Sequence, residues 1–290
     1  MERIQKLVVV GVGLIGGSFA LALKRAKAVA RVVGVGRSAA NIYRAQELKI
    51  IDAEGGFDRD TFGDADLVLL AMPVGQMLGV MRAIAPLLGD RTVLTDAGST
   101  KQDVADLAKR ELKKSLARFV PGHPIAGTEK SGAGAAFADL FRGRRVVLTP
   151  MKGTDRSALA RVRGAWTACG AKVFELSPRE HDAVLATVSH LPHALAFALV
   201  DQVARSRDAK RLFSYAAGGF RDFTRIASSS PEMWRDICIA NRKALLAEID
   251  RYGRGLERLR RMLERGDAKG LEALFAGARD ARDRWIRDRQ

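Results

Sequence analysis

A glycine-rich turn between an apolar strand and an apolar helix constrains the fold of this chain more than any other feature. Residues 4–10 are Val-rich and typical of a buried strand, and a Gly-x-Gly-x-x-Gly motif follows directly over 11–16. An Ala- and Leu-rich helix is expected over 19–28 and a second Val-rich strand over 31–35. This order predicts a βαβ unit whose turn presents backbone N–H groups to a pyrophosphate.

The three glycines each have a steric reason to be glycine. Gly11 permits the tight turn, Gly13 lets a pyrophosphate approach the backbone, and Gly16 allows the helix to pack closely on the strand. A glycine turn without a ligand is the alternative. We expect a dinucleotide to be held at this turn and at the ends of neighbouring strands, by Gly11, Gly13, Leu14, Ile15, Gly16, Met72, Pro73 and Asp96.

The end of the second strand bears on the choice of cofactor. About 20 residues after the glycines, an acidic residue normally binds the adenosine ribose hydroxyls, but this chain has Gly36, Arg37 and Ser38 there. No carboxylate at these three positions repels a 2′-phosphate, and the guanidinium of Arg37 can pair with one. We therefore expect NADP in preference to NAD, although a surface turn with an incidental arginine and use of both cofactors remain open.

The rest of the chain divides into two parts by pattern. At 290 residues, about two domains are expected. Strands alternate with helices as far as residue 176, which predicts an α/β fold with a Rossmann-type, doubly wound and mostly parallel sheet over 1–176. Further strands are expected over 67–71, 92–95, 118–120, 145–149 and 172–176. Ser177-Pro178-Arg179-Glu180 then starts an all-helical domain over 177–290, with helices at 178–204, 207–217, 231–252, 254–265 and 268–288.

Only four histidines occur, and three of them are candidates for chemistry. His123 lies in a Gly-His-Pro loop directly after a strand, where ligands bind in this architecture. His190 and His193 share one helix face, and Pro192 between them is expected to kink the helix. His181 is interpreted as an exposed residue of a first helical turn. No acidic or cysteine ligand completes a metal spacing, so no metal is expected.

Composition excludes some classes and leaves others open. Two distant cysteines, Cys169 and Cys238, rule out a disulfide scaffold and fit a reducing compartment. The start of the chain has no signal-peptide pattern, and we expect a cytoplasmic protein without a membrane-spanning run. The net charge of +16 is spread along the chain and permits a polyanion binder, an enzyme for small anions, or a generally basic surface.

Five motifs taken together carry a family resemblance. They are Gly-x-Gly-Leu-Ile-Gly-Gly-Ser at 11–18, Asp-x-Gly-Ser-x-Lys at 96–101, Gly-His-Pro-Ile-Ala-Gly at 122–127, Ser-His-Leu-Pro-His at 189–193 and Gly-Gly-Phe-x-Asp-Phe-Thr-Arg-Ile-Ala at 218–227. In this order they resemble the prephenate/arogenate dehydrogenases of tyrosine biosynthesis, over residues 4 to about 250. Gly36 departs from the acidic residue that many relatives carry, which puts a preference for NAD in doubt.

The resemblance implies an oxidative decarboxylation of prephenate, with arogenate as a second substrate, and hydride transfer to NAD(P). It implies His123 as the proton acceptor and Ser99 as the residue that orients it. Arg225 would bind a substrate carboxylate, with Asp222 and Glu129 as ionic partners. Trp234 would approach the pocket from the same or a second subunit, and the helical domain would form a homodimer. The remaining residues expected around the substrate are His193, Thr128, Lys101 and Gly218.

Two other functions remain as alternatives. A β-hydroxyacid-type NADP oxidoreductase would use a helix-borne lysine in a second Gly-rich motif, and no such segment is found where the helical domain begins. A basic nucleic-acid-binding protein would show a concentrated basic face and salt-sensitive binding. We expect a small-molecule substrate, no nucleic acid and no membrane as partners.

Overall fold

The computed structural model describes residues 2–128 and 130–288. The chain forms two compact units, which meet in sequence between Arg242 and Lys243. This division differs from the sequence-based boundary at residue 177, which stays a prediction about domains.

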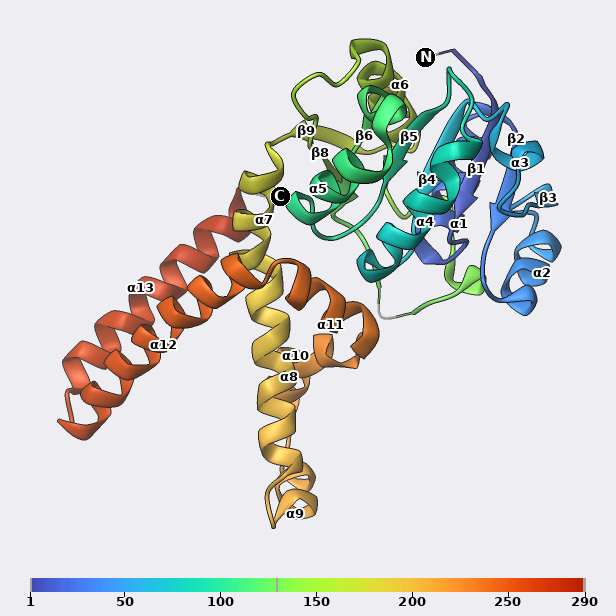
Figure 1. Cartoon of the computed structure of the whole chain (residues 1–290). Helices are drawn as coiled ribbons and strands as arrows, with labels where there is room; N and C mark the ends of the chain where they lie inside the picture. The colour runs from blue at the N-terminus through green and yellow to red at the C-terminus, as the bar shows by residue number, and fades with distance from the viewer. Residues whose placement is uncertain (1, 129, 289–290) are drawn as a thin grey trace. The chain divides into compact units, whose positions relative to one another are not determined.

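A six-stranded sheet, parallel throughout, forms the centre of the first unit (Figure 1). Its order, β3-β2-β1-β4-β5-β6, reverses direction beside β1, as in dinucleotide-binding folds. The strands are β1 (Ile4–Val10), β2 (Val29–Val35), β3 (Ala53–Glu54), β4 (Leu67–Leu70), β5 (Val93–Asp96) and β6 (Phe119–Val120). The expected Rossmann-type fold is confirmed.

Helices cover both faces of this sheet. Successive side chains of a strand point to opposite faces, so each strand packs against helices on both sides. Leu7 and Val9 pack with α1 and α6, whereas Val8 and Val10 pack with α4 and α5. The helices of this region are α1 (Leu14–Arg25), α2 (Ala39–Glu47), α3 (Arg59–Phe62), α4 (Met77–Ile84), α5 (Gln102–Glu111) and α6 (Arg156–Ala168).

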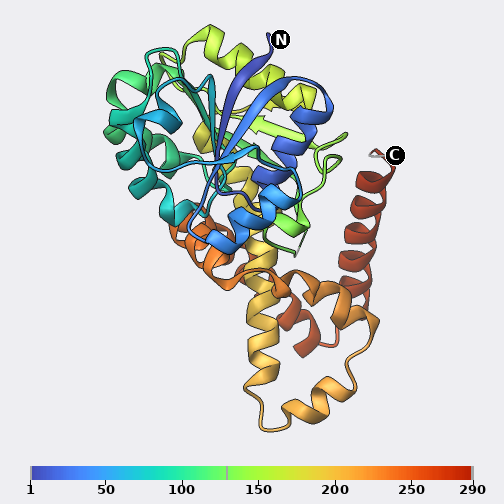
Figure 2. The ribbon, with the colours of Figure 1, turned by 90° about the vertical axis from the view of Figure 1, so that its right-hand side faces the viewer.

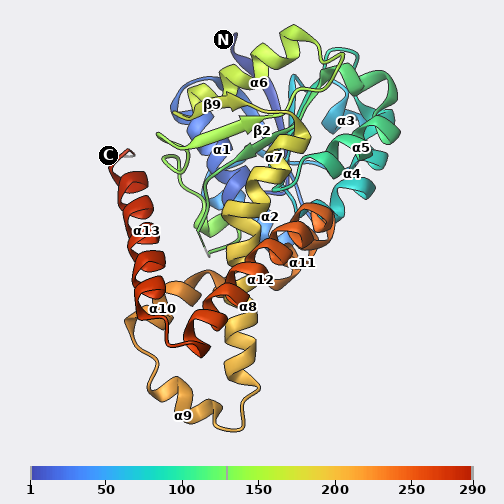
Figure 3. The same ribbon diagram turned by 90° about the vertical axis from the view of Figure 1, so that its left-hand side faces the viewer.

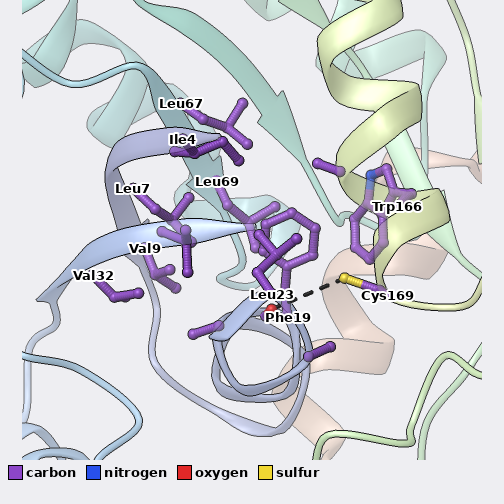
Figure 4. Packing of buried hydrophobic residues seen from close by; sticks show 14 of the residues in the cluster. Ile4, Leu7, Val9, Phe19, Leu23, Val32, Leu67, Leu69, Trp166 and Cys169 are labelled. Carbon is purple, nitrogen blue, oxygen red and sulfur yellow. Dashed lines mark hydrogen bonds between the residues drawn. The ribbon is translucent and has the colours of Figure 1, made fainter. Parts of the chain in front are cut away.

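Aromatic packing fixes α1 against α6 (Figure 4). The ring of Trp166 lies 4.5 Å from that of Phe19 and 5.1 Å from that of Phe141, measured between centroids. The thiol of Cys169 is buried beside them, 4.0 Å from the carbonyl oxygen of Phe19. Burial raises the pKa of this thiol.

A second, three-stranded sheet follows β6 and was not expected. It consists of β7 (Gly122–Pro124), β8 (Arg145–Leu148) and β9 (Lys172–Glu175), with β7 antiparallel to β8 and β8 parallel to β9. The strands expected at 145–149 and 172–176 exist but belong to this sheet. His123 lies within β7 rather than in a loop, paired with Val147.

Helices make up the remainder of the first unit. Figures 2 and 3 show α7 and α8 as successive segments along one direction, with α9 beyond the end of α8. The segment expected as one helix over 178–204 is α7, a π-helical turn over Ala186–His190, and α8. The helices are α7 (Pro178–Leu185), α8 (Leu191–Ala204), α9 (Ala209–Ser214), α10 (Gly218–Thr224) and α11 (Pro231–Ala240).

The π-turn ends where Pro192 enters the helix. Proline has no N–H group to donate to the carbonyl oxygen of Val188, so the regular α-helical ladder is interrupted at this point. By length and composition, Pro178–Ala204 would suffice to cross a membrane, contrary to the sequence-based expectation. It contains the buried polar residues His181, Asp182 and His190.

The second unit consists of α12 (Arg242–Glu264), which begins at the boundary, and α13 (Ala268–Arg287). The helix break expected at residue 253 is wrong. Gly253 and Gly255 lie inside α12, where two glycines cost about 1 kcal/mol each without ending a helix of 23 residues.

Candidate active site

A cavity of about 330 Å³ lies at the carboxyl ends of β1, β4 and β5. Parallel sheets bind ligands at this edge, where the strand order reverses. Five segments line it. Their lining residues are Gly13 to Ile15, Ala71 to Val74, Ala97 to Ser99, then His123, Pro124, Ala126 to Thr128 and Lys130 to Gly132, and finally Ser229, Ser230, Met233 and Ile237 from α11 and the residues just before it.

The glycine-rich turn has the shape that a dinucleotide requires. Gly11 has a φ of +95°, and a Cβ there would lie 2.5 Å from the carbonyl oxygen of Ala71. A Cβ on Gly16 would lie 2.3 Å from the carbonyl oxygen of Gly11. At Gly13, by contrast, a Cβ would meet nothing within 4 Å. The first turn of α1 has no side-chain cap, so its N–H groups can bind a pyrophosphate.

The expected cofactor residues divide into those at the cavity and those away from it. Gly13, Leu14, Ile15, Met72 and Pro73 line it. Gly36, Arg37 and Ser38 follow β2 and are exposed, and the Ser38 hydroxyl accepts the Asn41 N–H as the N-cap of α2. Asp96 is fully buried and does not line the cavity.

Asp96 and Lys101 form a buried ion pair instead of contacting the cavity. Lys101 was expected near the substrate, but its side chain is fully buried and its ammonium donates to Asp96 and, over 2.7 Å, to the carbonyl oxygen of Gly122. Asp96 accepts from the backbone N–H of Gly122 at 3.1 Å and of Gly98 at 2.8 Å. The pair thus fixes the end of β5 to the start of β7, beside His123.

His123 is hydrogen-bonded to His181, a residue whose burial was not predicted from the sequence. Its Nδ1 lies 2.8 Å from Nε2 of His181, whose Nδ1 lies 2.8 Å from Oδ1 of Asp182. His181 is fully buried, not exposed as expected. The capping box formed by Ser177 and Glu180 does start α7, but the next residue, His181, is covered because its ring packs against that of His123 in β7. The only sequence signal that could have identified His181 is its position directly after a capping box.

The surroundings of the histidines in this region favour their neutral form. Loss of hydration lowers the pKa of His123 well below its ordinary value of 6.5, and the nearby His181, Lys101 and His190 lower it further. Burial also lowers the pKa of His181 and brings that of His190 to about 4. A neutral imidazole can accept a proton, so His123 is suited to act as a base at neutral pH.

His190, His193 and Trp234 form a group behind the cavity. The rings of His193 and Trp234 are stacked with centroids 3.7 Å apart, and His193 Nδ1 lies 2.9 Å from the carbonyl oxygen of Ser189. His190 is buried and receives a 3.1 Å hydrogen bond from Asn241. Neither His193 nor Trp234 lines the cavity, although both were expected at the substrate.

The other expected substrate residues are only partly brought together. Ser99 and Thr128 line the cavity. Gly218, Asp222 and Arg225 lie on α10 and the turn after it, are exposed, and do not line it. Asp222 lies 3.6 Å from Arg221, not in a described pair with Arg225. Glu129 lies outside the described residues. Among the residues that are described, no cluster of His, Cys, Asp and Glu could hold a metal.

Family models match almost the whole chain. "Prephenate dehydrogenase, nucleotide-binding domain" matches residues 19–175, and "Prephenate dehydrogenase, dimerization domain" matches residues 177–277. Among curated proteins, the prephenate dehydrogenase of Bacillus subtilis is 39% identical over 96% of this chain and 75% of its own length. The cyclohexadienyl dehydrogenase of Zymomonas mobilis is 36% identical over 97% of this chain and 96% of its own.

Solved structures agree with these matches. The prephenate dehydrogenase of A. aeolicus, crystallised with hydroxyphenyl propionate and NAD⁺, superposes with a TM-score of 0.91 at 36% identity, covering 97% of this chain and 98% of that one. The arogenate dehydrogenase of Synechocystis superposes with a TM-score of 0.80 at 30% identity, covering 97% of this chain and 100% of that one.

Proposed function

This chain belongs to the prephenate dehydrogenase family, and from that premise we propose that it oxidatively decarboxylates prephenate, with arogenate as a second substrate. The observation that carries this proposal is one cavity bounded by an uncapped glycine-rich turn on one side and by His123 on the other. The turn suits a nicotinamide dinucleotide, and the histidine suits a substrate hydroxyl.

The chemistry divides between substrate, cofactor and protein. A bound nicotinamide supplies the acceptor for the hydride that leaves the ring carbon bearing the hydroxyl. Carbon dioxide leaves from the opposite ring carbon, and the ring becomes aromatic, which provides the driving force. His123 takes the hydroxyl proton at Nε2, because its Nδ1 is already bonded to His181, and returns it to the ring oxygen once loss of carbon dioxide has left a phenolate. The protein therefore aligns the reactants and removes one proton.

Substrate binding is assigned as follows. Ser99 and Thr128 lie at the cavity and are proposed to contact the substrate beside His123. We propose that Arg225 binds a substrate carboxylate once the helices around α10 adjust, with His193 and Trp234 bounding the side-chain end. An arginine is suited to this task because its guanidinium can bind a carboxylate through two hydrogen bonds.

The cofactor is a nicotinamide dinucleotide, and we propose that NADP is preferred. Support comes from the exposed Arg37 directly after β2 and from the absence of a carboxylate at positions 36–38. Arg37→Ala should raise KM for NADP about tenfold and leave KM for NAD unchanged, because only NADP carries the 2′-phosphate. Equal effects on both cofactors would refute this role for Arg37.

We also propose a cytoplasmic homodimer formed through the helical region. The family model names residues 177–277 a dimerisation domain. Large apolar side chains recur at helical spacing on α12 and remain exposed in the single chain, namely Leu246, Ile249, Leu256 and Leu263. Both cysteines are free, which supports a reducing compartment. Light scattering should give twice the mass of 31.5 kDa.

Turnover tests the activity directly. Purified protein is mixed with prephenate or arogenate and with NADP or NAD, and reduced nicotinamide is followed by absorbance. Lack of turnover in all four combinations would sink the proposal. His123→Asn should lower kcat by about 10² to 10⁴ because the proton acceptor is lost. Near-normal turnover by this variant would remove His123 from the base role.

A further inference from the structure

A chain of three side chains extends from the cavity into the interior of the protein. His123 contacts His181 through one ring nitrogen, and His181 contacts Asp182 through its other ring nitrogen, each over 2.8 Å. His181 is fully buried, and Asp182 is 5% exposed. The chain ends at a carboxylate that is itself held in place.

The carboxylate of Asp182 accepts hydrogen bonds from two backbone N–H groups. Its Oδ1 accepts from the Lys101 N–H at 2.8 Å, and its Oδ2 accepts from the Gln102 N–H at 2.9 Å. These contacts cap the N-terminus of α5. Asn241 also donates to the backbone carbonyl oxygen of Asp182 at 2.8 Å. A carboxylate bound in this way requires a donor from His181, which must be Nδ1–H.

The ring nitrogen of His181 that carries the proton then determines which ring nitrogen of His123 carries one. When neutral His181 carries its proton on Nδ1, its Nε2 has only a lone pair and accepts a hydrogen bond. The contacting nitrogen of His123 must therefore be Nδ1–H. In neutral His123 the other nitrogen, Nε2, is left without a proton, which is the form that a base at the cavity requires.

We propose that His181 and Asp182 are positioning residues that set the tautomer of His123, leaving Nε2 bare toward the substrate. This inference rests on the proposed function for the identity of the proton donor, but the tautomer itself is a property of the free protein. It assigns to His181 an orienting task that the family resemblance implied for Ser99. Ser99 keeps a place in the cavity lining.

The surrounding charges favour a neutral pair. Lys101, between β5 and α5, and His190, the last residue of the π-turn, both lower the pKa of His123, and Lys101 also lowers that of His181. Asp182 and Asp96 act on His181 in the opposite direction. Burial exceeds these carboxylate effects, so the pKa of His181 remains below 6.5. Both rings are therefore neutral at pH 8, where a tautomer can be measured.

The test reads the tautomer by long-range ¹H–¹⁵N correlation NMR at pH 8 on the full-length protein. Only four histidines occur, so single His→Gln variants assign each ring. Wild-type His123 should show the Nδ1–H form. In His181→Leu the acceptor is gone, and His123 should shift toward the Nε2–H form. His181→Gln can place its amide oxygen near the position of Nε2 and should keep His123 in the Nδ1–H form.

Kinetics should follow the tautomer. His181→Leu is expected to lower kcat roughly a hundredfold with little change in KM, because the base is misoriented while the binding groups remain. His181→Gln should recover most of kcat. Thermal unfolding and cofactor titration establish that both variants are folded and bind the dinucleotide. A purely structural role for His181 would lower stability without separating the Leu from the Gln variant in kcat or tautomer.

The outcomes separate this inference from the activity itself. If wild type turns over prephenate but carries the His123 proton on Nε2, the positioning role is wrong and the activity stands. If His123 is Nδ1–H and no substrate is turned over, the hydrogen-bonded arrangement stands and the proposed function is wrong. Full kcat in a folded His181→Leu variant would also overturn the positioning role.

Discussion

Single residues at the site were predictable when a local steric rule determines them. The glycine motif predicted both the close contact at Gly11 and the open backbone at Gly13, which the structure shows as a clash and as free space. The buried ion pair of Lys101 and the covered ring of His181 were not predictable in this way. Asp96 is close to Lys101 in sequence, but the contact of Lys101 with Gly122 and that of His181 with His123 both depend on β7, which is distant in sequence from Lys101 and from His181. No local pattern specifies that packing.

The two glycines allow a prediction with a built-in control. Gly13→Ala adds a methyl group into open space and should change unfolding free energy by less than about 0.5 kcal/mol. The same methyl group would meet the pyrophosphate, so cofactor Kd should rise roughly tenfold. Isothermal titration and chemical unfolding measure the two quantities.

Gly11→Ala should behave in the opposite way. The positive φ alone costs about 1 to 2 kcal/mol, and the contact with the Ala71 carbonyl oxygen adds to it. Unfolding free energy should therefore fall by more than for Gly13→Ala. Equal losses of unfolding free energy in both variants would contradict the open space beside Gly13.

Secondary-structure elements were predictable where the pattern was long. The alternation of Val-rich strands with helices correctly predicted a doubly wound parallel sheet, although β3 was not among the expected strands. The second sheet was missed because its strands have three or four residues, and such short runs do not reveal their partners. The stretch over 218–224 lies between the helices expected at 207–217 and 231–252, yet it is helix α10.

The start of α7 is an element that local chemistry does determine. The Ser177 hydroxyl accepts the Glu180 N–H, and the Glu180 carboxylate accepts the Ser177 N–H. Ser177→Ala should lower the unfolding free energy by about 1 kcal/mol, whereas Ser177→Asp retains a capping oxygen and should lose less. Urea unfolding of the two variants measures the difference, and equal losses would show that the cap is not the stabilising contact.

At the scale of the whole molecule, the net charge of +16 proved less informative than the four histidines. The excess is spread along the chain, and among its basic residues only Arg37 and Arg225 have a proposed ligand. An overall positive field can still attract an anionic dinucleotide and a dicarboxylate, and salt weakens that attraction. All four histidines, however, have pKa values lowered by burial.

Acid should therefore destabilise the protein in a defined range. The folded form keeps His190 neutral to a pKa of about 4, while the unfolded chain protonates it near 6.5. The unfolded state thus binds more protons between these values, and stability falls as pH decreases from about 6.5 to about 4. His190 alone accounts for a loss on the order of 3 kcal/mol.

Urea unfolding at a series of pH values measures this loss. His190→Gln cannot titrate and should give a shallower decline, with the remaining slope coming from the other three histidines and, toward pH 4, from carboxylates with a lowered pKa such as Asp155 and Glu180. An identical slope in the variant would show that His190 is not a source of the acid sensitivity.

The stack of His193 on Trp234 gives the protein an optical probe of its own. Among the described ring contacts, Trp234 has the ring of His193 stacked on its face, and the ring of His190 lies edge-on with its centroid 6.1 Å away. A protonated imidazole stacked on an indole quenches its fluorescence by accepting charge from the excited ring, whereas a neutral imidazole quenches it only weakly. Emission from Trp234 should thus dim on acidification below pH 6.5 as His193 ionises, with His190 contributing near its pKa of about 4, and no added label is needed.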